Sequence, residues 1–165
     1  MRISVLDANF ELLGEFSIYR SLIWDRRYYE AGVFEIHTAV DYFPLLNTGR
    51  YVYRHDRKDL GVIREVNYEQ TSDGARAAYC KGYFAEALLN NRVTIPGVNI
   101  TGTPEEIGRE LVRQFFMEPS DTGRYFPQIR LGDLSGLGTS VTLQSTGDPI
   151  GDKLYELERT QEMSH

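Results

Sequence analysis

The 165-residue sequence contains a single cysteine, Cys80, so no disulfide can form within one chain. No run of apolar residues approaches the roughly 20 that a transmembrane helix needs. The N-terminal stretch Met-Arg-Ile-Ser-Val-Leu-Asp is too short, and alternates too regularly between polar and apolar residues, for a signal peptide. We therefore expect a protein that is made in the cytoplasm and does not insert into a membrane.

The balance of charges argues against a nucleic-acid-binding protein. Acidic residues number 24 and basic residues 18, which gives a formal net charge of −6. Affinity for DNA depends largely on basic side chains that neutralise phosphates. The densest basic pair, Arg26-Arg27, is flanked by Asp25 and Glu30. We expect no sequence-specific contact with nucleic acid.

The length and the ordinary hydrophobic fraction of 41% indicate one globular domain over residues 1–165. Its most informative stretch is 19–36, which holds the only tryptophan. One strand parity is shared by Leu22, Trp24, Arg26, Tyr28, Phe34 and Ile36. Such alternation predicts β-structure, and Gly32 in mid-run predicts a bulge or bend. We expect a long, bent strand pair here.

The remaining pattern is mostly β. Hairpins are expected over 1–17 and over 61–83, the second turning at Ser72-Asp73-Gly74. Single strands are expected at 50–54, 92–95 and 141–144, with an edge strand at 125–131. The fold class is therefore β-rich α+β with an antiparallel sheet and two or three packed helices.

Helical signals are fewer. A short helix is expected at 84–89, and Thr103-Pro104-Glu105-Glu106 is a capping box that opens a longer one. A last helix spans 148–160 and has an apolar stripe of Ile150, Leu154 and Leu157. That stripe must be buried on this domain, on another subunit or on a continuation of a longer parent chain.

Residues that could carry out chemistry are scattered. His37, His55 and His165 lack the spacing of a metal site, and we expect no metal and no cofactor. Glu30 and Glu35 could form the carboxylate pair of a glycosidase, but Arg26 and Arg27 explain them more simply as ion-pair partners. We expect no catalytic residues. The 11 tyrosines and 8 phenylalanines could bind sugar, although aromatic residues along strands more often pack a core or a subunit interface.

Several segments carry a family resemblance. Residues 21–36, Ser-Leu-Ile-Trp-Asp-Arg-Arg-Tyr-Tyr-Glu-Ala-Gly-Val-Phe-Glu-Ile, are its strongest part, supported by 2–10, 49–54, 61–64, 81–89 and 101–107. Together they resemble the siphovirus Gp37-like tail proteins of phages and prophages. The resemblance implies a barrel-like hub module of the baseplate or tail tip that assembles as a ring, often a trimer, with other tail proteins. It also implies that this chain is the N-terminal part of a longer protein.

These observations favour a non-enzymatic virion structural protein, located in the tail after synthesis in the host cytoplasm. The alternatives are a tail-associated cell-wall hydrolase and a carbohydrate-binding module that uses exposed tyrosines such as Tyr51 or Tyr53. The residues that we expect at the core or at an interface are Trp24, Arg26, Arg27, Tyr28, Phe34, Tyr51 and Tyr53.

Trp24 gives this hypothesis its first test. Replacing a packed tryptophan with alanine removes a large apolar surface, so Trp24→Ala should lower the free energy of unfolding by about 3–5 kcal/mol. Thermal or denaturant unfolding measures the loss. An unchanged melting temperature would mean that Trp24 does not pack in the sheet.

Overall fold

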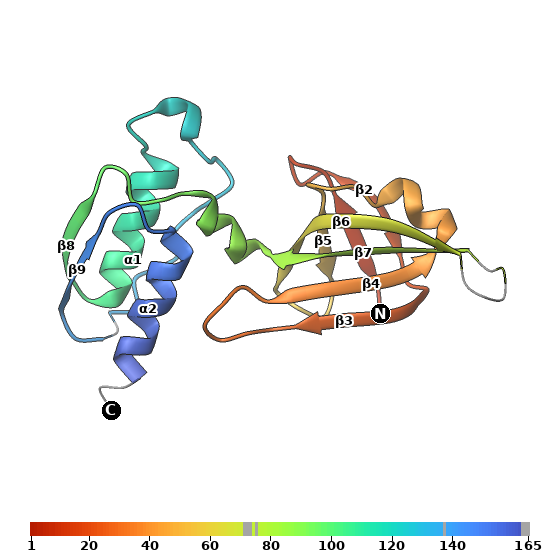
Figure 1. The fold of residues 1–165 in the computed structure, drawn as a ribbon, viewed down its shortest axis with the longest axis horizontal. Coiled ribbons are helices and arrows are strands. Elements are labelled where there is room, and N and C mark those ends of the chain that lie inside the picture. Colours follow the sequence, from red (N-terminus) through yellow and green to blue (C-terminus); the bar gives the residue numbers. More distant parts are fainter. Residues whose placement is uncertain (71–73, 75, 137, 163–165) are drawn as a thin grey trace. The chain divides into compact units, whose positions relative to one another are not determined.

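The structure, a computed structural model, describes residues 1–70, 74, 76–136 and 138–162. The chain forms two compact units, Met1–Ala87 and Leu88–His165. The first is built on a seven-stranded antiparallel sheet, and the second on a two-stranded sheet with two α-helices (Figure 1). The β-rich α+β class is thus confirmed. Whether the two units unfold together, as the single expected domain would, stays a prediction.

The strand order of the large sheet is β2-β1-β5-β6-β7-β4-β3, with every neighbouring pair antiparallel. Its strands are β1 (Ile3–Leu6), β2 (Leu12–Phe16), β3 (Tyr19–Asp25), β4 (Val33–Ala39), β5 (Tyr51–Arg54), β6 (Leu60–Gln70) and β7 (Arg76–Phe84). A 3₁₀ helix, Val40–Leu45, connects β4 to β5. Both expected hairpins are present, but the predicted turn residues Ser72 and Asp73 lie outside the described residues.

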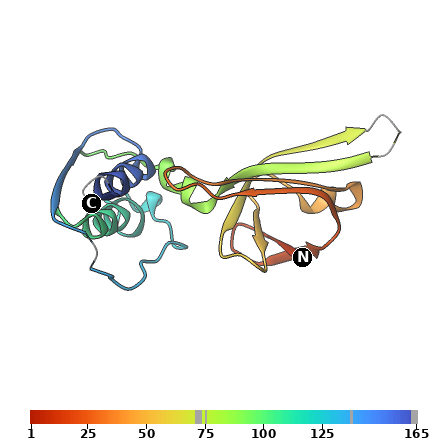
Figure 2. The ribbon, with the colours of Figure 1, turned by 90° about the horizontal axis from the view of Figure 1, so that it is seen from below.

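The large sheet curls but does not close. Figure 2 shows it bending over on itself, so that the N-terminal strands lie opposite the layer of later strands. Its two edges are β2 and β3, which are consecutive in the chain and joined through Ser17 and Ile18. In the described part of the sheet these edges are not paired with each other. The barrel-like closure that the resemblance implied is therefore not confirmed.

The stretch 19–36 forms a hairpin rather than one continuous bent run. β3 and β4 pair antiparallel, with Trp24 opposite Phe34, and a loop over 26–32 joins them. The predicted parity holds within the strands, because Leu22, Trp24 and Phe34 all contribute to the same core. It fails in the loop, where Tyr28 is 85% exposed and so takes no part in that core.

Glycines allow the inner face of the curled sheet to pack tightly. The core packed on this face comprises Ile3, Val5, Phe16, Phe34, Ile36, Val52, Ile63, Ala78, Cys80 and Phe84 from the strands, and Leu46 from the connection after the 3₁₀ helix. A Cβ on Gly61 would lie 2.6 Å from Phe34 Cε1, and a Cβ on Gly82 would overlap the Val62 carbonyl oxygen. Only glycine fits at these two places, because the space is already filled.

The second unit combines a hairpin with helices. It contains β8 (Val98–Gly102), α1 (Pro104–Val112) with a π-helical extension (Arg113–Met117), β9 (Val141–Ser145) and α2 (Ile150–Glu162). Short 3₁₀ helices cover Ala85–Asn91 and Thr122–Arg124. Two expectations were wrong: 125–131 is not a strand, and 92–95 contributes only an isolated bridge between Val93 and Pro149.

The helix signals in the sequence were reliable. Thr103 Oγ1 accepts a hydrogen bond from the Glu106 backbone N–H at 3.3 Å, and the Glu106 carboxylate accepts one from the Thr103 N–H at 2.8 Å. The predicted capping box is thus confirmed. The core of the second unit comprises Ile107, Leu111, Phe115, Phe116, Leu143, Ile150 and Leu157. The apolar stripe of α2 therefore packs mainly on its own unit, the first of the three alternatives, with Ile150 and Leu157 buried and Leu154 partly buried.

Gly82 tests the packing of the large sheet. Gly82→Ala would force a methyl group against the backbone of β6, so we expect it to lower the free energy of unfolding by about 3 kcal/mol or more. Gly132→Ala is the control, because no atom lies within 4 Å of the point that its added methyl group would occupy, and the change should stay within about 0.5 kcal/mol. Equal stabilities in denaturant unfolding would contradict the packing.

Candidate interaction surface

Trp24 lies at the centre of an aromatic cluster on the inner face of β3. Its ring centroid is 5.6 Å from that of Phe34 and 4.9 Å from that of Phe84. The Arg54 guanidinium carbon lies 5.3 Å from the Trp24 ring centroid, within the range of a cation–π contact. Two of the predicted residues, Trp24 and Phe34, are therefore brought together as packing residues inside the chain.

Asp59 fixes this edge of the sheet to the turn before β6. Its carboxylate accepts a long hydrogen bond from Trp24 Nε1 at 3.4 Å, and Arg26 Nε lies 3.2 Å from its other oxygen. The Asp59 side chain is only 14% exposed, whereas that of Arg26 is 71% exposed. Arg26 thus contacts its own chain while most of its surface remains open to a partner.

The loop over 26–31, here called the tip loop, is held by ion pairs. Arg27 Nε lies 3.1 Å from an Asp25 oxygen, and Arg27 Nη1 lies 3.1 Å from a Glu30 oxygen. Hydrogen bonding to Asp25 and the charge of Glu30 raise the pKa of Arg27, so it stays cationic. Tyr28 projects from this loop, and its ring centroid lies 6.3 Å from that of Tyr29. The tip loop is therefore tied down around an exposed aromatic ring.

Gly32 anchors the end of the tip loop. Its carbonyl oxygen accepts a hydrogen bond from the Phe84 N–H at 2.8 Å, and a Cβ on it would overlap Phe84 Cδ2. Glycine is required here by this close approach, not by a bulge within one strand. The loop thus leaves the sheet at a fixed point.

Tyr51 and Tyr53 lie elsewhere, on β5. Tyr51 is 7% exposed and packs against Phe10, with centroids 4.7 Å apart, and burial raises the pKa of its hydroxyl. Tyr53 is half-buried and meets the His55 ring edge-on at 5.4 Å. Tyr51 is therefore not available to bind a sugar through an exposed ring.

The outer face of the large sheet carries a polar network that sequence reasoning missed. His37 bonds to Glu35 at 2.5 Å and stacks on Tyr79, whose hydroxyl donates to Glu65 at 3.3 Å. Lys81 Nζ lies 3.0 Å from Glu65 and, mainly by hydrogen bonding, lowers the pKa of that carboxyl. The network depends on the register of β4 against β7, which places His37 opposite Tyr79. This register cannot be deduced from the order of residues along either strand alone.

The two carboxylates of the suggested catalytic pair, Glu30 and Glu35, contact different partners. Glu30 pairs with Arg27 in the tip loop, as the ion-pair explanation expected. Glu35 instead bonds to His37, its neighbour on the same face of β4.

Cys80 is fully buried, which raises the pKa of its thiol to about 12. Among the described residues, no group of three or more His, Cys, Asp or Glu side chains could hold a metal ion.

The second unit has a groove of about 660 Å³ along α1 and α2. We call it the α1–α2 groove. Its apolar lining consists of Pro104, Gly108, Val112, Leu131, Leu154 and Leu157, and Glu105, Arg109 and Glu158 complete it. Glu105 ties the loop around Ser135 and Gly136 to α1, because its carboxylate accepts a hydrogen bond from each of their N–H groups at 2.8 Å. The groove is therefore an apolar surface bordered by two carboxylates and one guanidinium, and Arg109 lies 3.9 Å from Glu105 rather than beside Glu158 in an ion pair.

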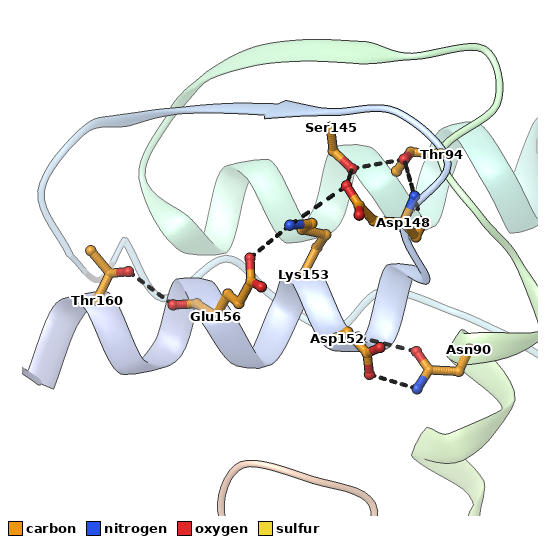
Figure 3. Close-up of polar contacts among 8 residues, drawn as sticks. All are labelled: Asn90, Thr94, Ser145, Asp148, Asp152, Lys153, Glu156 and Thr160. Carbon is orange, nitrogen blue, oxygen red and sulfur yellow. Dashed lines mark hydrogen bonds and ion pairs between the residues drawn. The ribbon is translucent and has the colours of Figure 1, made fainter.

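A second polar network fixes the start of α2 (Figure 3). Ser145 Oγ donates to Asp148 Oδ2 at 2.6 Å and lies 2.7 Å from Thr94 Oγ1. The Ser145 hydrogen bond, with a smaller contribution from the Lys153 ammonium group, lowers the pKa of the Asp148 carboxyl. These contacts join β9, α2 and the segment before β8, which indicates a structural role.

No described helix is long and apolar enough to cross a membrane.

Residues 2–165 match the protein family described as Siphovirus ReqiPepy6 Gp37-like protein. A search of curated proteins finds no match. Among solved structures, the fold is similar to that of the prophage tail protein gp18 from Listeria monocytogenes EGD-e, with a TM-score of 0.54 and 14% identity. That likeness covers 93% of this chain but only 45% of the Listeria protein.

The family match spans nearly the whole chain and confirms the resemblance seen in its sequence segments. The chain belongs to the Siphovirus ReqiPepy6 Gp37-like protein family.

Proposed function

We propose that this chain is a non-enzymatic structural component of a phage or prophage tail, at the baseplate hub or tail tip. Its family membership and the fold that it shares with a prophage tail protein support this role. In this proposal the protein is made in the host cytoplasm and then resides in the virion tail. Its partners are other tail proteins and copies of itself, arranged in a ring such as a trimer.

The observation that carries the proposal is the exposed aromatic ring on a fixed loop. Tyr28 is 85% exposed, yet ion pairs at Arg27 and the contacts of Gly32 tie the loop down on both sides of it. Tyrosine and arginine are enriched among residues that dominate the energy of protein interfaces. A loop already held in place loses little further entropy on binding. An assembly subunit would gain from such a loop.

The charge of the chain also suits a tail component. A net charge of −6 disfavours adhesion of DNA, so a surface of this kind could border a channel through which DNA passes. The same charge is compatible with contacts to other proteins, because opposite charges are interleaved along the chain.

The mass in solution tests the ring. We expect light scattering to show a mass that rises with concentration towards a small multiple of 18.9 kDa, because burial of aromatic and apolar surface drives association. A mass that stays at one chain across all concentrations would contradict self-assembly.

An assay for turnover of purified peptidoglycan tests the non-enzymatic role in parallel. We expect no release of soluble fragments by the wild-type chain, and the same result from Glu35→Gln as the matched control. Release by the wild-type chain that Glu35→Gln abolishes would instead support the hydrolase.

A further inference from the structure

Tyr28 has no evident task within its own chain. Its ring is 85% exposed, and its hydroxyl makes no hydrogen bond to any residue that the structure describes. Leaving a large aromatic ring in water forgoes the stabilisation that burial of its apolar surface would give. The neighbouring side chain of Arg26 is also largely open, at 71% exposure. The tip loop therefore presents an aromatic group and a cation to the outside.

The α1–α2 groove has complementary properties. Its volume of about 660 Å³ lies in the range of sites that take a compact organic group, and its lining is mainly apolar. Glu158 stands beside it, and among the described residues no cation contacts the Glu158 carboxyl. Glu158 is an exposed residue at the edge of the groove, and its partial burial there raises the pKa of its carboxyl. A guanidinium placed next to Glu158 would pair with this carboxylate.

From this complementarity we infer that Tyr28 of one copy inserts into the α1–α2 groove of a second copy, with Arg26 beside Glu158. The inference rests on the self-assembly in the proposed function and names its contact surfaces. The tip loop and the groove are different surfaces of the chain, so the contact is heterologous. A head-to-tail contact of this kind forms a closed ring if its rotation closes. The occupant of the groove is thus a second copy of this chain.

Tyr28→Ala gives the first test. Truncation of a central interface tyrosine typically costs enough to weaken association at least about thirty-fold. We expect sedimentation equilibrium to show that loss for Tyr28→Ala. Tyr83→Ala is the matched control, because it removes another exposed tyrosine, 48% accessible, from the outer face of β7 and should leave association unchanged. Equal effects of the two variants would overturn the inference.

A charge exchange tests the polar part of the contact. Arg26→Glu and Glu158→Lys should each weaken association, and the double variant should recover most of the loss because the opposite charges face each other again. Arg26→Glu also breaks the pair with Asp59, so thermal unfolding of each variant is measured beside its association. Additive losses in the double variant would contradict the pairing.

Cysteine cross-linking locates the contact. Ala31→Cys chains, which keep Tyr28 and Arg26 in the tip loop, are mixed with differently tagged Leu154→Cys chains and oxidised, and we expect a disulfide-linked pair containing both tags. Tyr125→Cys replaces Leu154→Cys in the control, since Tyr125 is exposed in the same unit but does not line the groove. The native Cys80 is fully buried with a thiol pKa of about 12, which keeps it from reacting.

The results separate the inference from the proposed function. Association of the wild-type chain with no effect of Tyr28→Ala and no tip-to-groove disulfide would overturn this contact but leave self-assembly standing. A wild-type chain that remains monomeric at every concentration would overturn the ring itself, and the contact with it.

Discussion

The large sheet depends on aromatic rings that lie directly against glycine backbone. Phe34 packs over Gly61 and Phe84 packs over Gly32, at distances that leave no room for a Cβ at either glycine. Trp24 covers both rings from β3. This contact joins β3, β4, β6 and β7 into one curled surface around a common core. A side chain at either glycine would force these rings to shift.

The same arrangement divides the aromatic residues into two groups. Rings on the inner face, such as Phe34 and Phe84, are buried and hold the fold. The tip loop begins where β3 ends, and there Tyr28 leaves the core entirely. Because Gly32 fixes the end of the loop on Phe84, the packing inside the sheet also positions the exposed ring outside it. The packing of the sheet and the placement of the exposed ring are thus coupled through one hairpin.

Local signals in the sequence were sufficient for much of this fold. Alternation predicted β3 and β4, and the capping box at Thr103 predicted the start of α1. The strand β8 was missed because its run, Val98–Gly102, is only five residues long and directly follows Pro96-Gly97, a pair typical of turns. Residues 125–131 looked like an edge strand, but Pro127 lies in a segment without ladder bonds.

The candidate surface was less predictable for a physical reason. Parity placed Tyr28 with Trp24, yet parity has meaning only while a strand continues, and the strand ends at Asp25. Tyr51 looked available to a ligand, but its cover by Phe10 depends on a tertiary contact between distant residues. The α1–α2 groove likewise arises from the packing of two helices far apart in sequence.

The central claim is that one group of aromatic residues holds the sheet while Tyr28 serves association. Hydrogen–deuterium exchange measured over a range of protein concentrations tests both parts at once. Amides of β4 should be protected at every concentration, whereas amides of 26–31 should gain protection only as the chain associates. Exchange in 26–31 that is independent of concentration in an associating sample, or fast exchange throughout β4, would contradict the account.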